Sequence, residues 1–452
     1  MPSPVPVPGF LARLVPPTPL SRRLAVQSML FAIGEGTFNT GSAVFLTKVV
    51  GMSPAQAGLG ITITMVASFV FAYPLGRVVD RMGPKRMWSV AAFGRGAAFL
   101  ALPFVTSFEQ YIVVGVVFAA FEALGDAARE AYILDVMSRE ERLRTQAYLY
   151  SWLNAGFTLG AILGGAALAF DSLDVVRFTP WFAAALMLTN AVAIGRMPRA
   201  PHDLRVAAGE VRQRVPGPGP LRNVGWMLTE LCTGTMWTNQ VLLNIVIPLW
   251  LVDRTDAPHV LLAWLFGTNT VLCIFLPAYM SKMVTDLRSA MRNIAIATGF
   301  FVVSCGITAV THSTVGFVTI ALVWLGHVTV TGAELFLSAA NWTFQADLMD
   351  PRRRGEYQGV GEVFGKAGFL WAPAVYTYLA MEWGEAGWIV IAAIVSASAI
   401  GLRWSVAAAG GSPSGPSRWP TPPRVRYLDV KITSRGLRCS CACSVDSSPR
   451  TV

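Results

Sequence analysis

Long apolar segments separated by short polar ones recur along the chain from residue 24 to residue 404. An α-helix rises about 1.5 Å per residue, so about 20 apolar residues suffice to cross the hydrocarbon core of a bilayer. Spans of this length are predicted at 24–48, 55–75, 87–105, 110–133, 145–170, 180–197, 223–251, 260–280, 291–310, 314–342, 358–380 and 387–404. The pattern therefore predicts an all-α membrane protein with twelve transmembrane helices.

The polar segments divide the chain into five parts. The stretch 198–222 contains a run of alternating proline and glycine, and we expect it to be a cytosolic linker between two six-helix bundles, 24–197 and 223–404. Residues 1–23 are rich in proline, and residues 405–452 are rich in proline, serine and arginine. We expect these two ends to be a disordered cytosolic arm and a disordered cytosolic tail.

Basic residues are distributed unevenly between the loops. The linker and every second loop hold most of them, whereas the opposite loops hold only Lys48, Arg177 and Arg254. Loops rich in Lys and Arg stay in the cytoplasm, so we expect both termini there, in a multi-pass protein of the plasma membrane.

Composition supports the membrane interpretation. Hydrophobic residues make up 54% of the chain and charged residues 14%, with a mean hydropathy of +0.51; a soluble protein has about 25% charged residues. The net charge of +10 is scattered between apolar segments, which argues against a nucleic-acid partner. Lone cysteines in the spans and the group Cys439, Cys441 and Cys443 in the tail predict no disulfide framework, metal site or cofactor.

The two bundles resemble each other in sequence at a spacing of 212 residues. At this spacing Asp135 corresponds to Asp347 and Arg142 to Arg354. Glu122 likewise corresponds to Glu334, and the run Ala-Gly-Phe at 155–157 recurs at 367–369. Duplicated six-helix halves are typical of secondary transporters whose substrate site lies at mid-membrane between the halves.

The loop between the second and third spans carries the clearest motif, Gly-Arg-Val-Val-Asp-Arg-Met-Gly-Pro-Lys-Arg at 76–86. It resembles the signature G-x-x-x-D-R-x-G of the major facilitator superfamily through Gly76, Asp80, Arg81 and Gly83, with Lys85 among the basic residues that come after it. We expect the two glycines to permit a tight hairpin and Asp80 to face a neighbouring helix N-terminus. The resemblance implies two pseudo-symmetric bundles, alternating access and a cytoplasmic latch in this loop.

A second motif lies in the fifth span, where Gly156, Gly160, Gly164 and Gly165 are similar to an exporter-associated motif of the same family. Ala161 stands where that motif has proline, and Phe121 stands where the family has an arginine linked to proton coupling. Small residues at every fourth position also allow ordinary close packing of helices, so both interpretations stay open.

Ionisable residues inside spans are costly and are therefore candidates for function. The candidates for proton coupling are Glu35, Glu122, Glu230 and Glu334, with Glu35 placed first. Arg95 needs an acidic partner, and Glu35, Glu122 and Asp126 are equally available to it. The polar candidates for the cavity are Asn39, Arg95, Gln240, Asn244, His327 and Lys366.

Local spacing predicts two further ion pairs. Asp126 and Arg129 share a face of the fourth span, where they can pair with each other or with Arg81 and Lys85 as part of a gate. Lys366 comes four residues after Glu362, a spacing that favours a local pair.

These observations lead to one functional interpretation and two alternatives. We expect a monomeric, proton-coupled secondary transporter, not an enzyme, that exports small hydrophobic compounds and has membrane lipid, substrate and protons as its partners. The first alternative is an importer of a small nutrient or organic acid, which needs an unpaired cation in its cavity. The second alternative is a membrane scaffold or sensor that transports nothing.

Overall fold

The computed structural model describes residues 15–170, 172–209 and 219–411. Six long helices form the first half of the chain. They are α1 (Pro19–Val44, extended by a π-helical turn, Phe45–Val49), α2 (Pro54–Met82), α3 (Pro84–Ala101), α4 (Phe108–Val136), α5 (Arg139–Ala169) and α6 (Leu173–Gly195).

Six spans also make up the second half, but three of them are interrupted. The unbroken ones are α13 (Leu287–Val310), α14 (Phe317–Leu348) and α17 (Glu385–Gly411). The first interrupted span consists of α8 (Val224–Met236), α9 (Asn239–Val241), a π-helical turn (Leu242–Val246) and α10 (Ile247–Arg254). The second consists of α11 (Leu261–Phe275) and α12 (Pro277–Met280). The third consists of α15 (Arg354–Phe369) and α16 (Ala372–Trp383). Pro277 and Pro373 lie at the start of α12 and α16, where a proline cannot continue the preceding helix.

Hydropathy alone identifies fewer spans than the fold contains. Within the described ranges, nine helices are long and apolar enough to cross a membrane, and the bent α11–α12 pair makes ten. The remaining two spans are α1, which carries Glu35, and α15–α16, which carries Glu362 and Lys366. These two are less apolar because their polar side chains face other helices and not lipid.

Several helix boundaries differ from the predicted ones; α2 ends at Met82 and not at residue 75, and α6 begins at Leu173 and not at residue 180. Helix α1 begins at Pro19, not at residue 24, because Thr18 caps it through a reciprocal bond with Ser21. The linker contains a short helix, α7 (Pro201–Ala207), and α17 continues to Gly411 instead of ending at residue 404. The disorder predicted for the two ends lies outside the described residues at 1–14 and at 412–452, where the three tail cysteines are. The middle of the predicted linker, 210–218, also lies outside them.

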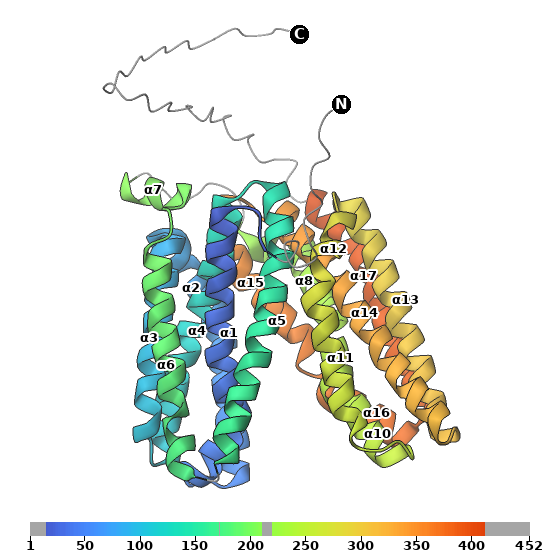
Figure 1. The fold of residues 1–452 in the computed structure, drawn as a ribbon. Coiled ribbons are helices and arrows are strands. Elements are labelled where there is room, and N and C mark those ends of the chain that lie inside the picture. The colour runs from blue at the N-terminus through green and yellow to red at the C-terminus, as the bar shows by residue number, and fades with distance from the viewer. Residues whose placement is uncertain (1–14, 171, 210–218, 412–452) are drawn as a thin grey trace, which may run out of the picture. The chain divides into compact units, whose positions relative to one another are not determined.

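A very close helix pair occurs at corresponding places in the two halves, α1 with α5 and α8 with α15 (Figure 1). A Cβ atom on Gly160 would lie 2.5 Å from the carbonyl oxygen of Ile33, and one on Gly164 would lie 2.5 Å from that of Thr37. In the second half a Cβ atom on Gly368 would lie 2.2 Å from the carbonyl oxygen of Leu231. The repeat seen in the sequence is therefore a repeat of helix packing.

The two halves touch through a small set of helices. Helix α15 packs against α2 and α4, and α5 packs against α11, α12 and α14. The hydrogen bonds found between the halves extend from the middle of these helices to the end at which α7 lies. Figure 1 shows α7 at the upper end of the first half.

Candidate functional site

Asp80 lies at the end of α2 and binds the N-terminus of α15 in the other half. Its two carboxylate oxygens accept hydrogen bonds of 2.8 Å from the backbone N–H groups of Gly355 and Glu356. These groups belong to the first turn of α15, where backbone donors have no partner within the helix and the helix dipole favours a negative charge. The expectation that Asp80 faces a helix N-terminus is confirmed, and the contact joins the two halves.

Glycines allow this approach, although not both in the predicted way. Gly83 has a φ of +93° between α2 and α3, as a tight hairpin requires. Gly76 does not serve the hairpin, and that part of the prediction is wrong. A Cβ atom on Gly76 would lie 2.1 Å from the carbonyl oxygen of Gly355, so Gly76 is needed where α2 crosses α15.

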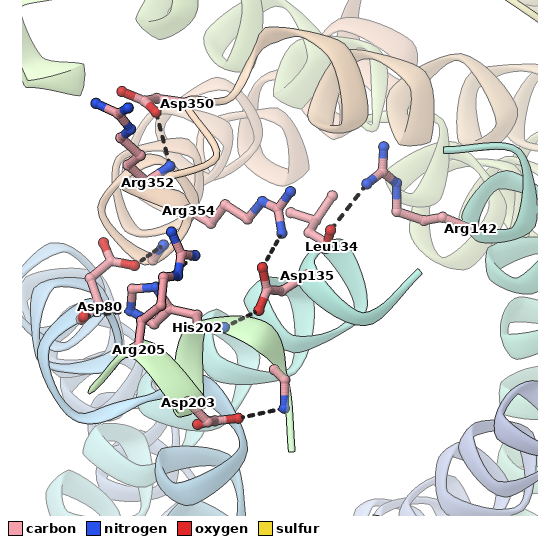
Figure 2. A network of polar contacts seen from close by, with 12 residues as sticks. Asp80, Leu134, Asp135, Arg142, His202, Asp203, Arg205, Asp350, Arg352 and Arg354 are labelled. Atoms are coloured by element: carbon pink, nitrogen blue, oxygen red, sulfur yellow. Dashed lines mark hydrogen bonds and ion pairs between the residues drawn. The ribbon is translucent and has the colours of Figure 1, made fainter. Parts of the chain in front are cut away.

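A second contact between the halves lies beside the first (Figure 2). Arg354 forms an ion pair of 3.1 Å with Asp135, which also accepts the backbone N–H of His202 at 2.7 Å. Arg142 donates to the carbonyl oxygens of Leu134 and Ala346, at 3.3 Å and 3.5 Å. We call Asp80, Asp135, Arg142, His202 and Arg354 the latch network.

The linker helix α7 completes this network through residues that the sequence analysis did not select. His202 donates from Nε2 to the carbonyl oxygen of Asp80 at 2.7 Å. Asp203 accepts from the backbone N–H groups of Lys85 and Ala200, at 3.3 Å and 3.0 Å. Burial raises the pKa of Asp203, and these two hydrogen bonds oppose the shift. Of the two basic residues expected in the latch, Arg81 is exposed. Lys85 contributes its backbone N–H, which donates to Asp203.

A cavity of about 270 Å³ is lined from both halves, and a second of about 230 Å³, lined by the second half alone, shares part of its wall. Both are lined by Asn341, Gln345, Gln358 and Glu362. The larger adds Asp126, Arg129, Glu130, Gln146 and Trp342, and the smaller adds Glu230, Thr233, Gly234, Trp237, Gly361, Gly365, Lys366 and Phe369. We call the two together the central cavity.

The cations of the central cavity are already paired. Arg129 lies 2.5 Å from Glu130 and donates to the hydroxyl of Ser28 at 3.2 Å. Of the alternatives that the sequence left open, the pairing of Arg129 with Asp126 is therefore not found among the described residues. Glu130 lines the same cavity as Arg129. Lys366 pairs with Glu362 at 3.6 Å, as predicted, and donates to Ser68 of the first half at 3.2 Å.

Arg95 pairs with Glu35, the partner that the sequence could not select. The distance is 2.5 Å, and both side chains are buried. The guanidinium also lies 4.8 Å and 5.0 Å from the ring centroids of Phe31 and Phe118, which favours its charge further. Arg95 lines a third cavity of about 220 Å³ inside the first half, which shares Asp126 and Arg129 with the central cavity.

Glu334 lies between the halves, deeper than the latch network. It accepts a hydrogen bond from the hydroxyl of Tyr150 on α5 and another, of 3.1 Å, from the side-chain amide of Asn269. Tyr150 was not among the predicted residues. Its signal in the sequence was weak, because tyrosine in a span is equally typical of helix packing.

The other predicted residues lie apart from these cavities. Asn39 and Asn244 are exposed, and Gln240 and His327 line none of the three cavities, with His327 buried beside Phe266. Gly156, Gly160 and Gly164 pack against α1, whereas a Cβ atom on Gly165 would meet nothing within 4 Å. Glu122 lies near Arg95 and Asp126 and acts on both electrostatically.

A family model described as Major Facilitator Superfamily matches residues 24–373. The chain belongs to this superfamily. It is thus a multi-pass membrane transporter with two six-helix halves, and the expectations of a transporter rather than an enzyme and of this fold are confirmed.

Curated relatives of this transporter are distant. The uncharacterized MFS-type transporter YqjV of Bacillus subtilis is 27% identical over 27% of this chain, and the match spans only 30% of its length. The multidrug resistance protein MdtH of Aeromonas salmonicida is 21% identical over 78% of this chain and 87% of its own. The class H tetracycline resistance protein of Pasteurella multocida is 21% identical over 80% of this chain and 90% of its own.

Solved structures share the fold at low identity. A bacterial homologue of the iron transporter ferroportin in its outward-facing state has a TM-score of 0.65 at 13% identity, over 86% of this chain and 100% of the other. FucP in its outward conformation has a TM-score of 0.64 at 13% identity, over 85% of this chain and 98% of the other.

Proposed function

We propose that this transporter exports small, largely hydrophobic compounds by alternating access, in exchange for protons. The observation that carries the proposal is the latch network. Asp80, Asp135 and Arg354 tie the halves together at the α7 end, while the central cavity lies deeper between the same halves. Contacts of this kind must break when the halves rock about the cavity, as alternating access requires.

Loop charges support a cytoplasmic position for the α7 end, since α7 belongs to the arginine-rich linker. With that orientation the latch closes the cytoplasmic side, and the structure corresponds to an outward-facing state. Hydrophobic substrates and the outward direction are supported by two relatives, a multidrug resistance protein and a tetracycline resistance protein. The glycines of α5 no longer support the direction, because their contacts with α1 are explained by packing.

Buried carboxylates supply the groups for coupling to protons. Glu35, Glu122, Glu230 and Glu334 all lie within spans and are at least half-buried or next to a cavity. Glu35 stays the first candidate, because protonation would release Arg95 from the only ion pair found for it in the described residues. An organic-acid importer is disfavoured, since Arg95, Arg129 and Lys366 each have a carboxylate partner.

The test is accumulation of a panel of fluorescent hydrophobic compounds in energised cells with and without the protein. Export predicts lower accumulation in cells that contain the protein, and the difference should vanish when an uncoupler collapses the proton gradient. Equal accumulation of every compound, or higher accumulation with the protein, would contradict the proposal.

A further inference from the structure

We propose that the central cavity binds organic cations, specifically protonated amines with an aromatic or other apolar body, and that Glu230 is their main counter-charge. The inference rests on the proposed function, because it names the substrate class of the same cavity. It is carried by the charges left over in the cavity, by its unpaired hydrogen-bond acceptors and by its aromatic wall.

The charges of the central cavity do not balance. Its cations, Arg129 and Lys366, are paired with Glu130 and Glu362. Two further carboxylates, Asp126 and Glu230, line the cavity from opposite halves without an ion pair among the described residues. The cavity therefore has a formal excess of negative charge, which a cationic ligand would compensate.

Of the two carboxylates without an ion pair, Glu230 is the more deeply buried. Only 7% of the residue is exposed, and its Oε1 atom has no hydrogen-bond partner in the described part of the chain. A buried carboxylate without partners is costly, so a ligand that supplies a positive charge and a donor gains the most at this position. Gly361 lies beside it, at a position where an added Cβ atom would be 3.4 Å from the Glu230 carboxyl carbon, an ordinary contact distance.

Unpaired acceptors surround the same space. Oε1 of Gln358 and Oδ1 of Asn341 are buried and, like Oε1 of Glu230, make no hydrogen bond to any described residue. All three belong to side chains that line the smaller cavity. Acceptors without donors favour a ligand that brings several N–H groups, as a primary or secondary ammonium does.

Aromatic side chains provide the complementary apolar surface. Trp237 and Phe369 line the smaller cavity and Trp342 the larger one. Such rings bind an apolar body by contact area and attract an adjacent cation through their π-electrons. An anionic ligand meets the reverse situation, because it would have to displace Glu130 or Glu362 from their cations.

Calorimetric titration of the full chain in lipid nanodiscs at neutral pH tests the inference with three compounds that share the same biphenyl group and differ in charge. They are 4-phenylbenzylamine, which is an ammonium at this pH, neutral 4-biphenylmethanol and anionic biphenyl-4-carboxylate. We expect the ammonium to bind about tenfold or more tightly than the other two, as an interaction with a desolvated charge implies. Glu230→Gln should remove that preference, and Glu230→Asp should keep it.

Glu382→Gln is the matched control. It makes the same Glu-to-Gln change in the same half, at an exposed residue of α16 that does not line the cavity. Asp126→Asn tests the other unpaired carboxylate and replaces Glu230→Gln if that variant does not fold. Equal binding of the three compounds, or a preference that survives both variants, overturns the inference and leaves export of neutral compounds standing. Preferential ammonium binding in a protein that fails to lower dye accumulation supports the inference and rejects the export proposal.

Discussion

Arg354 in the first turn of α15 lies 3.1 Å from Asp135 in the last turn of α4, so an arginine of the second half is neutralised by an aspartate of the first. In the sequence repeat Asp135 corresponds to Asp347, and Arg354 corresponds to Arg142. Asp135 of the first connector therefore pairs with Arg354 of the second. Arg142 is directed in the corresponding way toward the carbonyl oxygen of Ala346, next to Asp347.

Asp80→Asn should insert in the membrane and bind substrate but transport it poorly. An asparagine has one acceptor oxygen for two backbone N–H groups and lacks the charge that interacts favourably with the α15 dipole. We expect the equilibrium between the two states to shift by about 1–3 kcal/mol. Uptake into liposomes measures the effect, with Asp174→Asn at the far end of the first half as the control. A transport rate equal to that of the unmodified protein would remove the latch from the mechanism.

Gly76→Ala should loosen the contact between α2 and α15. The added Cβ atom would lie 2.1 Å from a backbone oxygen of Gly355, and overpacking of this kind costs about 1–3 kcal/mol. Amide hydrogen exchange at Gly355 and Glu356 should accelerate. Gly58→Ala on the same helix meets nothing within 4 Å and should leave these amides protected. Unchanged exchange in Gly76→Ala would mean that the halves are held elsewhere.

Glu35→Gln should lower stability because it leaves Arg95 buried without its ion-pair partner. Removing one member of a buried pair costs about 3–5 kcal/mol. Arg95→Leu in the same chain should restore expression and the melting temperature of the purified protein. Gradient-driven transport then separates two roles of Glu35. Transport that stays absent in the double mutant indicates coupling at Glu35, and transport that returns moves the coupling site to Glu122, Glu230 or Glu334.

Truncation after Gly411 should leave insertion and transport intact, whereas truncation after Ser405 should not. The sequence alone favoured a cut at residue 405, but the last turn of α17 is packed. Ala409 is fully buried, and a Cβ atom on Gly225 would lie 2.2 Å from its backbone nitrogen. Yield and melting temperature of the two truncated proteins provide the measurement. Equal values would show that the last turn contributes nothing.

A reporter that is active only in the cytoplasm should give a signal when fused after Gly411. The reason is the excess of basic residues in the linker and in every second loop. A fusion after Arg254, at the opposite end of a span, is the control and should be silent. The reverse result would invert the topology and make the latch network extracytoplasmic.

Periodicity and local spacing were enough to predict part of the structure from the sequence. The length of the apolar segments predicted the twelve spans and the two halves, and the structure contains both. The spacing of four residues predicted the Glu362–Lys366 pair, which is also found. Asp80 was also predicted to face a helix N-terminus, but no local rule could indicate that this helix lies 275 residues away. The assignment of Gly76 to the hairpin failed for the same reason.

Other features depend on how distant helices pack. Arg95 had three acidic candidates at similar depth, and only the three-dimensional arrangement of the bundle shows that its side chain on α3 reaches Glu35 on α1. Helical spacing left Asp126 as one possible partner of Arg129, yet the Arg129 side chain turns to Glu130 and to Ser28 on α1. Tyr150, Gln345 and Gln358 line the contact between the halves without a motif, because single polar residues in spans are also common in helix packing.

The double role of Asp135 bears on how often the transporter can cycle. One of its oxygens binds Arg354 of the other half, and the other oxygen binds the N–H of His202 in the linker helix α7. When the halves separate at this end, the carboxylate loses one partner and retains the other, while incoming water replaces the arginine. Asp135 thus keeps the N–H of His202 as a donor when it gives up Arg354. Losing one of two partners costs a buried carboxylate less than losing both, so the contact is suited to repeated release.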